Sequence, residues 1–310
     1  MPSPAPSRAA PAPLSDNARG ALWMLFSVVN ASAMTVAARW LSEGMDSRMV
    51  VFSRAALTLI ALAPLLAWPR FRALLRFSRP RLHLARGAMV AVSTQFGFYA
   101  IAHLPLANVT VLFFTAPIFA TLLAGPINGE RVGPRRWAAV AAGFSGALII
   151  LRPGLAPLDL AMAAALGSSL LFATTLALSR RIAAADGPVA AYVSSVAMTA
   201  ALGLPLALAA WTPPGDGAAV AALAVLVIAG AARGMGDIQA YRHAEASVVG
   251  VIAYLRLVLI GGAGWLIFDE GVDRWTLTGG AVIIGASLYI ARREALRGRA
   301  AAAPKAGPAD

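Results

Sequence analysis

The chain of 310 residues is 59% hydrophobic and only 13% charged, with a mean hydropathy of +0.72, so it lacks the polar surface that a soluble fold of this size needs. The formal net charge of +12 raises nucleic acid as a partner, but the arginines lie at the ends of apolar runs and form no basic tail, which argues against it. The absence of cysteine excludes disulfides and cysteine metal sites.

Residues 1–19, rich in proline, alanine and serine, predict a disordered cytoplasmic tail, and residues 294–310 form a second one. Between them recur apolar runs long enough to cross a hydrocarbon core of about 30 Å as helices. The first run continues through a sequence that resembles a signal-peptide cleavage site at 31–33, so we predict an uncleaved first helix. We therefore expect an all-α polytopic membrane protein with ten transmembrane helices, at 20–41, 49–68, 86–104, 107–127, 137–151, 158–179, 188–211, 218–239, 246–268 and 275–291.

The distribution of basic residues predicts how these helices are oriented. Lys and Arg are enriched in cytoplasmic loops. With the N-terminus inside, the inner segments hold 19 basic residues and the outer segments hold four, namely Arg39, Arg48, Arg152 and Arg274. Both termini are therefore expected in the cytoplasm.

A weak internal repeat appears when the sequence is shifted by 140 residues. His103 then coincides with His243, Glu130 with Glu270, and Arg152 with Arg292. The shift divides the chain into two five-helix repeats, 20–152 and 153–293. Because five is odd, the second repeat enters the membrane from the opposite side. Such inverted repeats recur in secondary transporters, which bind substrate near the midplane between the halves.

Three stretches resemble the drug/metabolite transporter superfamily in its EamA-type ten-helix form: "LANVTVLFFTAPIFATLLAGPINGERV" (106–132), "AYRHAEASVVGVIAYLRLVLIGGAGWLIFDEGVD" (240–273) and "GGAVIIGASLYIARRE" (279–294). The resemblance covers about residues 20–295 and implies transport of a small organic metabolite without ATP, in a bacterial inner membrane. The chain departs from the family pattern in two places. Leu257 stands 140 residues beyond Pro117, where a second proline is expected, and Arg256 is not part of the pattern.

Arg256 is the main candidate for a substrate-binding residue. It lies ten residues into its span, about 15 Å deep. A cation there costs at least about 2.5–3.5 kcal/mol unless it faces a cavity or a partner. We expect Arg256 to bind an anionic group such as a carboxylate with its planar fork. An ion pair with Asp237 is the structural alternative. Arg54, about 8 Å into its span, either faces the cavity or extends to the interface.

Neutral groups complete the candidate substrate site. Asn30 lies mid-span in the first helix, Gln95 and Tyr99 share a face of the third, and Tyr254 precedes Arg256 by two residues. Thr115 precedes Pro117, which is expected to kink the fourth helix toward a cavity. Each of them is alternatively a packing residue.

Three acidic residues are predicted to have structural or gating roles. Glu130 and Glu270 end the fourth and ninth helices, where a carboxylate opposes the helix dipole and needs a basic partner. The candidates for that partner are Arg131, Arg135 and Arg274. Asp237 is four residues from Arg233 and is expected to pair with it.

Two other functions remain open from the sequence alone. "GFSG" (143–146) has the form used by rhomboid-like intramembrane serine hydrolases, with Ser145 as nucleophile and His103 or His243 as base. A non-transporting membrane scaffold is the other alternative. The sequence has no phosphate-binding loop and no zinc motif, so no cofactor or metal is expected. The partners are a small-molecule substrate and the lipid bilayer, and the protein is a monomer or a homodimer.

Overall fold

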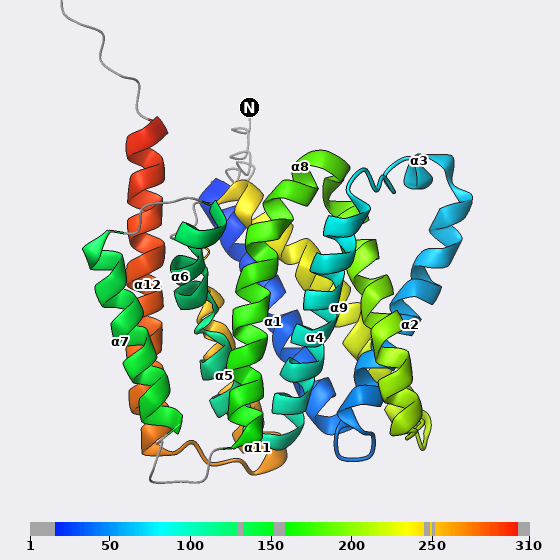
Figure 1. Ribbon diagram of the computed structural model, residues 1–310. Helices are drawn as coiled ribbons and strands as arrows, with labels where there is room; N and C mark the ends of the chain where they lie inside the picture. Colours follow the sequence, from blue (N-terminus) through cyan, green and yellow to red (C-terminus); the bar gives the residue numbers. More distant parts are fainter. Residues whose placement is uncertain (1–15, 129–132, 152–158, 245–248, 250–251, 303–310) are drawn as a thin grey trace, which may run out of the picture.

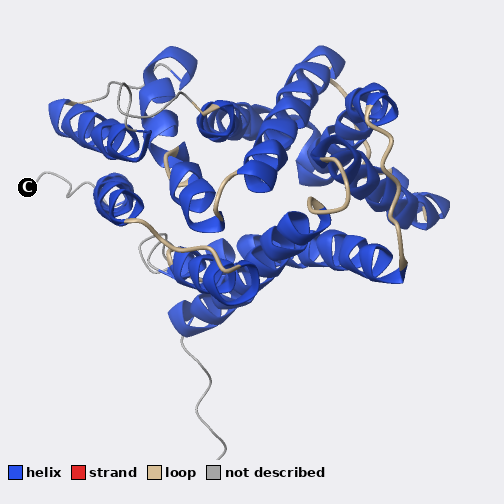
Figure 2. Cartoon of the chain, turned by 90° about the horizontal axis from the view of Figure 1, so that it is seen from below, coloured by secondary structure: helices blue, strands red, loops and turns tan. Residues whose placement is uncertain are grey.

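The computed structural model describes residues 16–128, 133–151, 159–244, 249 and 252–302 (Figure 1). In the first half these residues form α1 (Asp16–Leu41), α2 (Ser47–Leu62), the 3-10 helix η1 (Ala63–Ala67), α3 (Pro69–Arg72), α4 (Pro80–His103), α5 (Leu106–Phe113), α6 (Ala116–Asn128) and α7 (Pro134–Leu151). In the second half they form α8 (Leu160–Ala209), α9 (Gly217–His243), α11 (Leu255–Phe268) and α12 (Arg274–Ala302). Figure 2 shows these helices and their connecting loops from below.

The protein is an all-α polytopic membrane protein. Among the described residues, five helical stretches are long and apolar enough to cross a bilayer: Ala18–Leu41, Ser47–Ala67, Leu106–Leu123, Ala185–Ala209 and Gly217–Ala240. Three shorter apolar helices cover Trp137–Ile150, Leu160–Leu176 and Leu255–Phe268. Many large apolar side chains point outward, such as Leu266, which is 74% exposed. In lipid, an exposed leucine of this kind contacts acyl chains.

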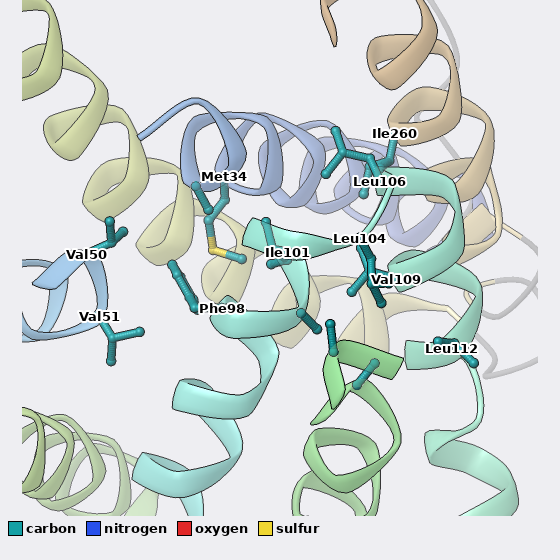
Figure 3. Close-up of a cluster of buried hydrophobic side chains, with 14 of the residues drawn as sticks. Met34, Val50, Val51, Phe98, Ile101, Leu104, Leu106, Val109, Leu112 and Ile260 are labelled. Atoms are coloured by element: carbon teal, nitrogen blue, oxygen red, sulfur yellow. The ribbon is translucent and has the colours of Figure 1, made fainter. Parts of the chain in front are cut away.

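The bundle has two ends, which we name from Figure 1. The upper end holds the start of α1, residues 63–79, Gly187 and the end of α9, and the lower end holds the loops 42–46, 104–105, 210–216 and 269–273. At the lower end, buried side chains fill the space between the helices; Figure 3 shows Leu104, Leu106 and Ile260 among them. The lower end is therefore closed by an apolar core.

α8 contains both the sixth and the seventh predicted spans. Gly187 interrupts its helical geometry with φ 84° and ψ 165°, and Pro188 follows. A positive φ favours glycine because the residue lacks a Cβ, and a residue before proline avoids the helical region. The chain therefore reverses at Gly187, at the upper end of the bundle (Figure 1).

The fourth and ninth predicted spans are both broken helices. α5 ends at Phe113 and α6 begins at Ala116, as the helix-interior Pro117 predicts. α11 begins at Leu255, after a turn at Tyr254, although no proline stands at Leu257. The rings of Phe114 and Tyr254 stack with centroids 4.8 Å apart, and these two residues are separated by the repeat offset of 140.

Candidate functional site: an arginine-lined cavity

A cavity of about 590 Å³ lies inside the bundle, with lining residues from α1, α2, α4, α5, α6, α8, α9 and α11. On α4 the lining residues recur every three or four positions, which places them on one helical face. They run from Arg86, near the upper end, through Val90 and Gly97 to Ile101. The cavity therefore extends along much of α4, from the upper end toward the closed lower end.

Four arginines from four helices line this cavity: Arg54, Arg86, Arg233 and Arg256. Arg233 Nε lies 3.6 Å from Asp237 Oδ2, which stands four residues further along α9. Asp237 also accepts a hydrogen bond from the hydroxyl of Ser27. The cavity wall therefore carries more positive than negative charge, which attracts anions strongly where water is scarce.

Arg256 lies in the first turn of α11. Its Nη2 donates to Thr35 Oγ1 at 3.3 Å, and its buried Nε has no hydrogen-bond partner among the described residues. A buried N–H group without a partner is costly. The start of a helix also carries a partial positive charge, which disfavours a cation and favours an anion. This position therefore combines an unused hydrogen-bond donor with positive charge.

Arg54 and Arg86 have other described partners. The guanidinium of Arg54 lies over the ring of Phe98, 5.8 Å from its centroid, so Arg54 faces inward. Arg86 Nη1 donates to Ser195 Oγ at 2.6 Å and to the carbonyl of Ala191 at 3.0 Å, both on α8. Neutral oxygens on α8 thus contact Arg86, and an aromatic ring on α4 contacts Arg54.

Five neutral candidates from the sequence are absent from the cavity wall. Two of them are amides. Asn30 Nδ2 donates to the carbonyl of Phe26 at 2.8 Å, one turn earlier on α1. Gln95 Nε2 is buried without a hydrogen-bond partner among the described residues, and it lies 3.5 Å from the position of a Cβ on Gly203. Gln95 therefore faces the second half of α8.

The other three are Tyr99, Thr115 and Tyr254. The ring of Tyr99 packs on His103, with centroids 4.2 Å apart. Thr115 is buried and donates to the carbonyl of Leu112 at 2.6 Å. Tyr254 stacks at the break before α11, as described above. Of the seven substrate-binding candidates, only Arg54 and Arg256 line the cavity.

Glu270 joins both halves of the chain at the lower end. Its Oε1 lies 3.1 Å from Arg39 Nε, and its Oε2 accepts from the backbone N–H of Leu106 at 2.6 Å. The expected partner Arg274 instead lies over the ring of Trp275, 4.9 Å from its centroid. The prediction of a basic partner for Glu270 is confirmed, but the partner is Arg39. Sequence spacing missed it because Arg39 is distant in the chain. Glu130, Arg131 and the side chain of Arg135 lie outside the described part of the chain.

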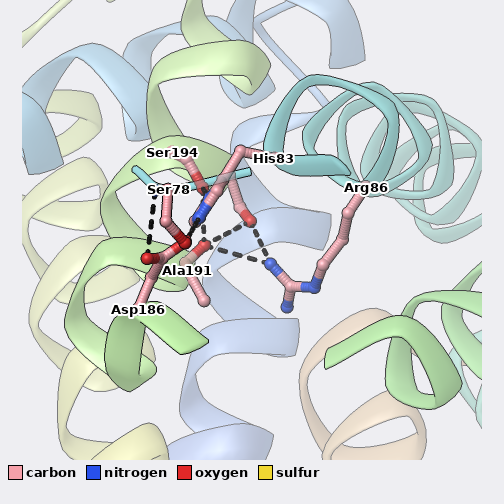
Figure 4. A network of polar contacts seen from close by, with 7 residues as sticks. Ser78, His83, Arg86, Asp186, Ala191 and Ser194 are labelled. Carbon is pink, nitrogen blue, oxygen red and sulfur yellow. Dashed lines mark hydrogen bonds and ion pairs between the residues drawn. The ribbon is translucent and has the colours of Figure 1, made fainter. Parts of the chain in front are cut away.

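A second polar cluster, which sequence reasoning missed, ties α4 to α8 at the upper end (Figure 4). Asp186 accepts from the backbone N–H of Ser78 at 3.0 Å and lies 3.0 Å from His83 Nε2. His83 Nδ1 is 2.9 Å from Ser194 Oγ. His83 is only 4% exposed. The sequence places a histidine and an aspartate near the ends of apolar runs, which is the one feature that could have suggested this cluster. Sequence spacing cannot show that two residues 103 positions apart are in contact.

The predicted nucleophile Ser145 is not in this cluster. Its hydroxyl donates to the carbonyl of Ala142 at 2.7 Å on the exposed face of α7. No contact with a histidine is described for it.

Comparison with known proteins decides the family. The model of the EamA-like transporter family matches residues 18–152. The riboflavin transporter of Rhizobium johnstonii is 31% identical over 285 residues, which cover 90% of this chain and 93% of that protein. The chain belongs to the EamA-like transporter family. The chain is also similar to the S-adenosylmethionine uptake transporter of Rickettsia felis (28% identity; 86% of this chain and 90% of that protein) and to the pseudopaline exporter CntI of Pseudomonas aeruginosa (27% identity; 88% and 96%).

A solved structure shares the fold of this chain. It superposes with a TM-score of 0.52 at 20% identity, covering 91% of this chain and 96% of the other. The relatives are named as transporters and not as enzymes, so the hydrolase hypothesis is set aside. This EamA-like protein is an integral membrane transporter of small molecules.

Proposed function

We propose that this EamA-like transporter is a secondary carrier that moves a small organic anion across the bacterial inner membrane, and that the arginine-lined cavity binds it. The single observation behind this proposal is Arg256, which lines the cavity with a buried Nε that lacks a partner among the described residues. An anionic group on the substrate would supply that hydrogen bond and offset the excess positive charge.

The size of the cavity and the names of the relatives support a metabolite-sized substrate. Small-molecule sites usually measure about 300–1,000 Å³, and this cavity measures about 590 Å³. Riboflavin and S-adenosylmethionine, which the relatives are named for, are organic molecules of that class. A wall with four arginines disfavours a net cation such as S-adenosylmethionine and favours a carboxylate or a phosphate ester.

We further infer that transport proceeds by alternating access between two inverted repeats, 20–152 and 153–293. Contacts between the repeats support this arrangement. α1 packs on α9, while their counterparts at the offset of 140, the first half of α8 and α4, also pack on each other. An example is the bond from Ser93 Oγ to the carbonyl of Ser168 at 2.8 Å. By the distribution of basic residues the upper end is cytoplasmic, so we interpret this conformation as closed to the outside.

The test is the substitution Arg256→Leu, with Arg256→Lys as the charge-conserving variant. The matched control is Arg242→Leu, because Arg242 is an exposed arginine on α9 that does not line the cavity. Thermal unfolding of the purified protein is measured with carboxylates and phosphate esters, each paired with its neutral amide or alcohol. A ligand stabilises the state to which it binds. The best stabiliser is then radiolabelled for uptake into proteoliposomes.

We expect anions to stabilise the wild type and the Arg242→Leu control more than their neutral analogues do. In Arg256→Leu the loss of charge-assisted hydrogen bonds, worth about 1.5–3 kcal/mol, should weaken binding about ten- to a hundredfold and abolish uptake. Normal uptake by a folded Arg256→Leu protein would reject the site. The absence of any preference for anions in the wild type would reject the substrate class.

A further inference from the structure

We propose that the cavity has two separate anion subsites and takes an elongated dianion, with one anionic group at Arg256 and the other at Arg86. This inference rests on the anion-binding function proposed above and adds to it a second charge and a length. Arg86 stands at a span end and was not a candidate from the sequence, but it lines the same cavity as Arg256.

The first subsite is where Arg54, Arg233 and Arg256 approach one another. Arg54 Nη2 lies 3.5 Å from the position of a Cβ on Gly230, one turn before Arg233 on α9. Met34 Sδ lies 3.5 Å from the same position, and the next residue, Thr35, accepts a hydrogen bond from Arg256 Nη2. Asp237 offsets only part of this positive charge, and the buried Arg256 Nε lacks a partner among the described residues.

The second subsite is at the upper end of α4. Arg54 lies over Phe98, and Phe98 follows Arg86 by twelve residues on the same helix. At 1.5 Å per residue, the α-carbons of Arg86 and Phe98 are about 18 Å apart. The two cationic regions therefore lie near opposite ends of the cavity. Bonds to Ala191 and Ser195 fix the Arg86 guanidinium against α8 at that end (Figure 4).

The wall between the two subsites fits the body of such a ligand. α4 presents Val90, Ser93 and Thr94 along this stretch, and α8 presents Ser168 and Phe172. None of these side chains is charged, and the hydroxyls of Ser93 and Ser168 each donate to the backbone carbonyl of the other residue at 2.8 Å. A charge in the middle of the ligand would lose its hydration there without gaining an opposite charge. The geometry therefore favours charges at both ends and an uncharged middle.

The experiment compares three molecules of almost equal length: sebacate, monomethyl sebacate and dimethyl sebacate, which carry two, one and no charges at neutral pH. Dissociation constants are measured by calorimetry on the full-length protein in nanodiscs. Succinate serves as a short dianion. We expect the wild type to bind sebacate about tenfold more tightly than the monoester, and succinate no more tightly than the monoester, since a short dianion cannot reach both subsites.

Substitution of Arg86 assigns the second subsite. Arg86→Gln should remove the preference for sebacate over the monoester, whereas Arg86→Lys, which keeps the charge, should retain part of it. Arg242→Gln, at an exposed arginine outside the cavity, should retain the full preference. If Arg86→Gln does not fold, Arg86→Met keeps the aliphatic stem and takes its place.

The two proposals fail in distinguishable ways. If sebacate and its monoester bind the wild type equally, or if the preference persists in folded Arg86→Gln, the second subsite is wrong and the anion cavity stands. An equal loss of affinity for both ligands in Arg86→Gln would mean that Arg86 only ties α4 to α8, which also overturns this inference. If neither charged ligand binds more tightly than dimethyl sebacate, the proposed anion-binding function fails as well.

Discussion

The ion pair between Arg39 and Glu270 offers the sharpest test of the lower end as a gate. Glu270 accepts hydrogen bonds from Arg39 and from the backbone of Leu106, so it links the loop after α11 to two elements of the first half. The side chains of Arg39 and Glu270 are only 23% and 11% exposed. If the halves rock apart here during transport, these contacts exist only in the conformation closed to the outside. Glu270→Ala should then destabilise that conformation alone.

The size of the effect follows from burial. Removing one partner of a buried ion pair costs about 3–5 kcal/mol. The lower limit applies because Arg39 is partly exposed and keeps a bond from Nη1 to the carbonyl of Ala102 at 2.5 Å. A loss of about 3 kcal/mol in one of two states shifts their populations about a hundredfold. Glu270→Gln keeps an acceptor for Leu106 and should shift the populations less.

The chain has no cysteine, so a single introduced thiol reports this shift cleanly. Ile101→Cys places the thiol on the cavity wall at the end nearest the lower loops, where Ile101 is 4% exposed. The rate of reaction with a membrane-impermeant maleimide added outside intact cells is measured. We expect Glu270→Ala to raise this rate about a hundredfold. The control is Arg48→Gln, at a more exposed arginine of the same end that pairs with Asp46. Equal rates in the two variants would refute the gate.

Two further outcomes test the packing and the capping of the helices. Gly279→Val should destabilise the protein to chemical unfolding in detergent by about 1–3 kcal/mol, because a Cβ there would lie 2.5 Å from the carbonyl oxygen of Gly146. Gly285→Val, on the same helix with open space around it, is the matched control and should lose much less stability. A hydrogen bond from Arg48 lowers the pKa of Asp46, the N-cap of α2, below its usual 3.8. The stabilisation by this carboxylate is therefore complete above the usual pKa and is lost as the pH falls through the lowered pKa. Unfolding midpoints of wild type and Asp46→Ala should therefore differ at neutral pH and converge in acid.

Helix positions could be predicted from the sequence, but the rotation of each helix about its axis could not. In a soluble protein the apolar stripe shows which face points inward. Lipid is as apolar as the protein interior, so this signal is lost in a membrane. On α1 the sequence favoured Asn30, but the cavity is lined by Met34 and Thr35, four and five residues further along the helix. On α4 it favoured Gln95, but Ser93 and Thr94 line the cavity.

The two charged candidates line the cavity and the five neutral ones do not, which agrees with the higher cost of placing a cation than an amide in hydrocarbon. Arg256 and Arg54 were identified on this basis, and both line the cavity. The same reasoning did not identify Arg86 as a residue of the cavity wall. An arginine at a span end is expected to extend to the headgroups and to reflect only the orientation of the protein. Only the packing of α4 against α8 brings Arg86 to the cavity wall.

The break before α11 shows where a proline-based prediction stops. Pro117 predicts the interruption between α5 and α6, since proline removes a backbone donor and clashes with the preceding turn. The ninth span has Leu257 in the equivalent place and still breaks at Tyr254. Tyr254 stacks on Phe114, its counterpart in the first repeat, which stands at the other break. Tertiary packing of two equivalent breaks against each other accounts for the second interruption, and it leaves Arg256 in the first helical turn beyond it.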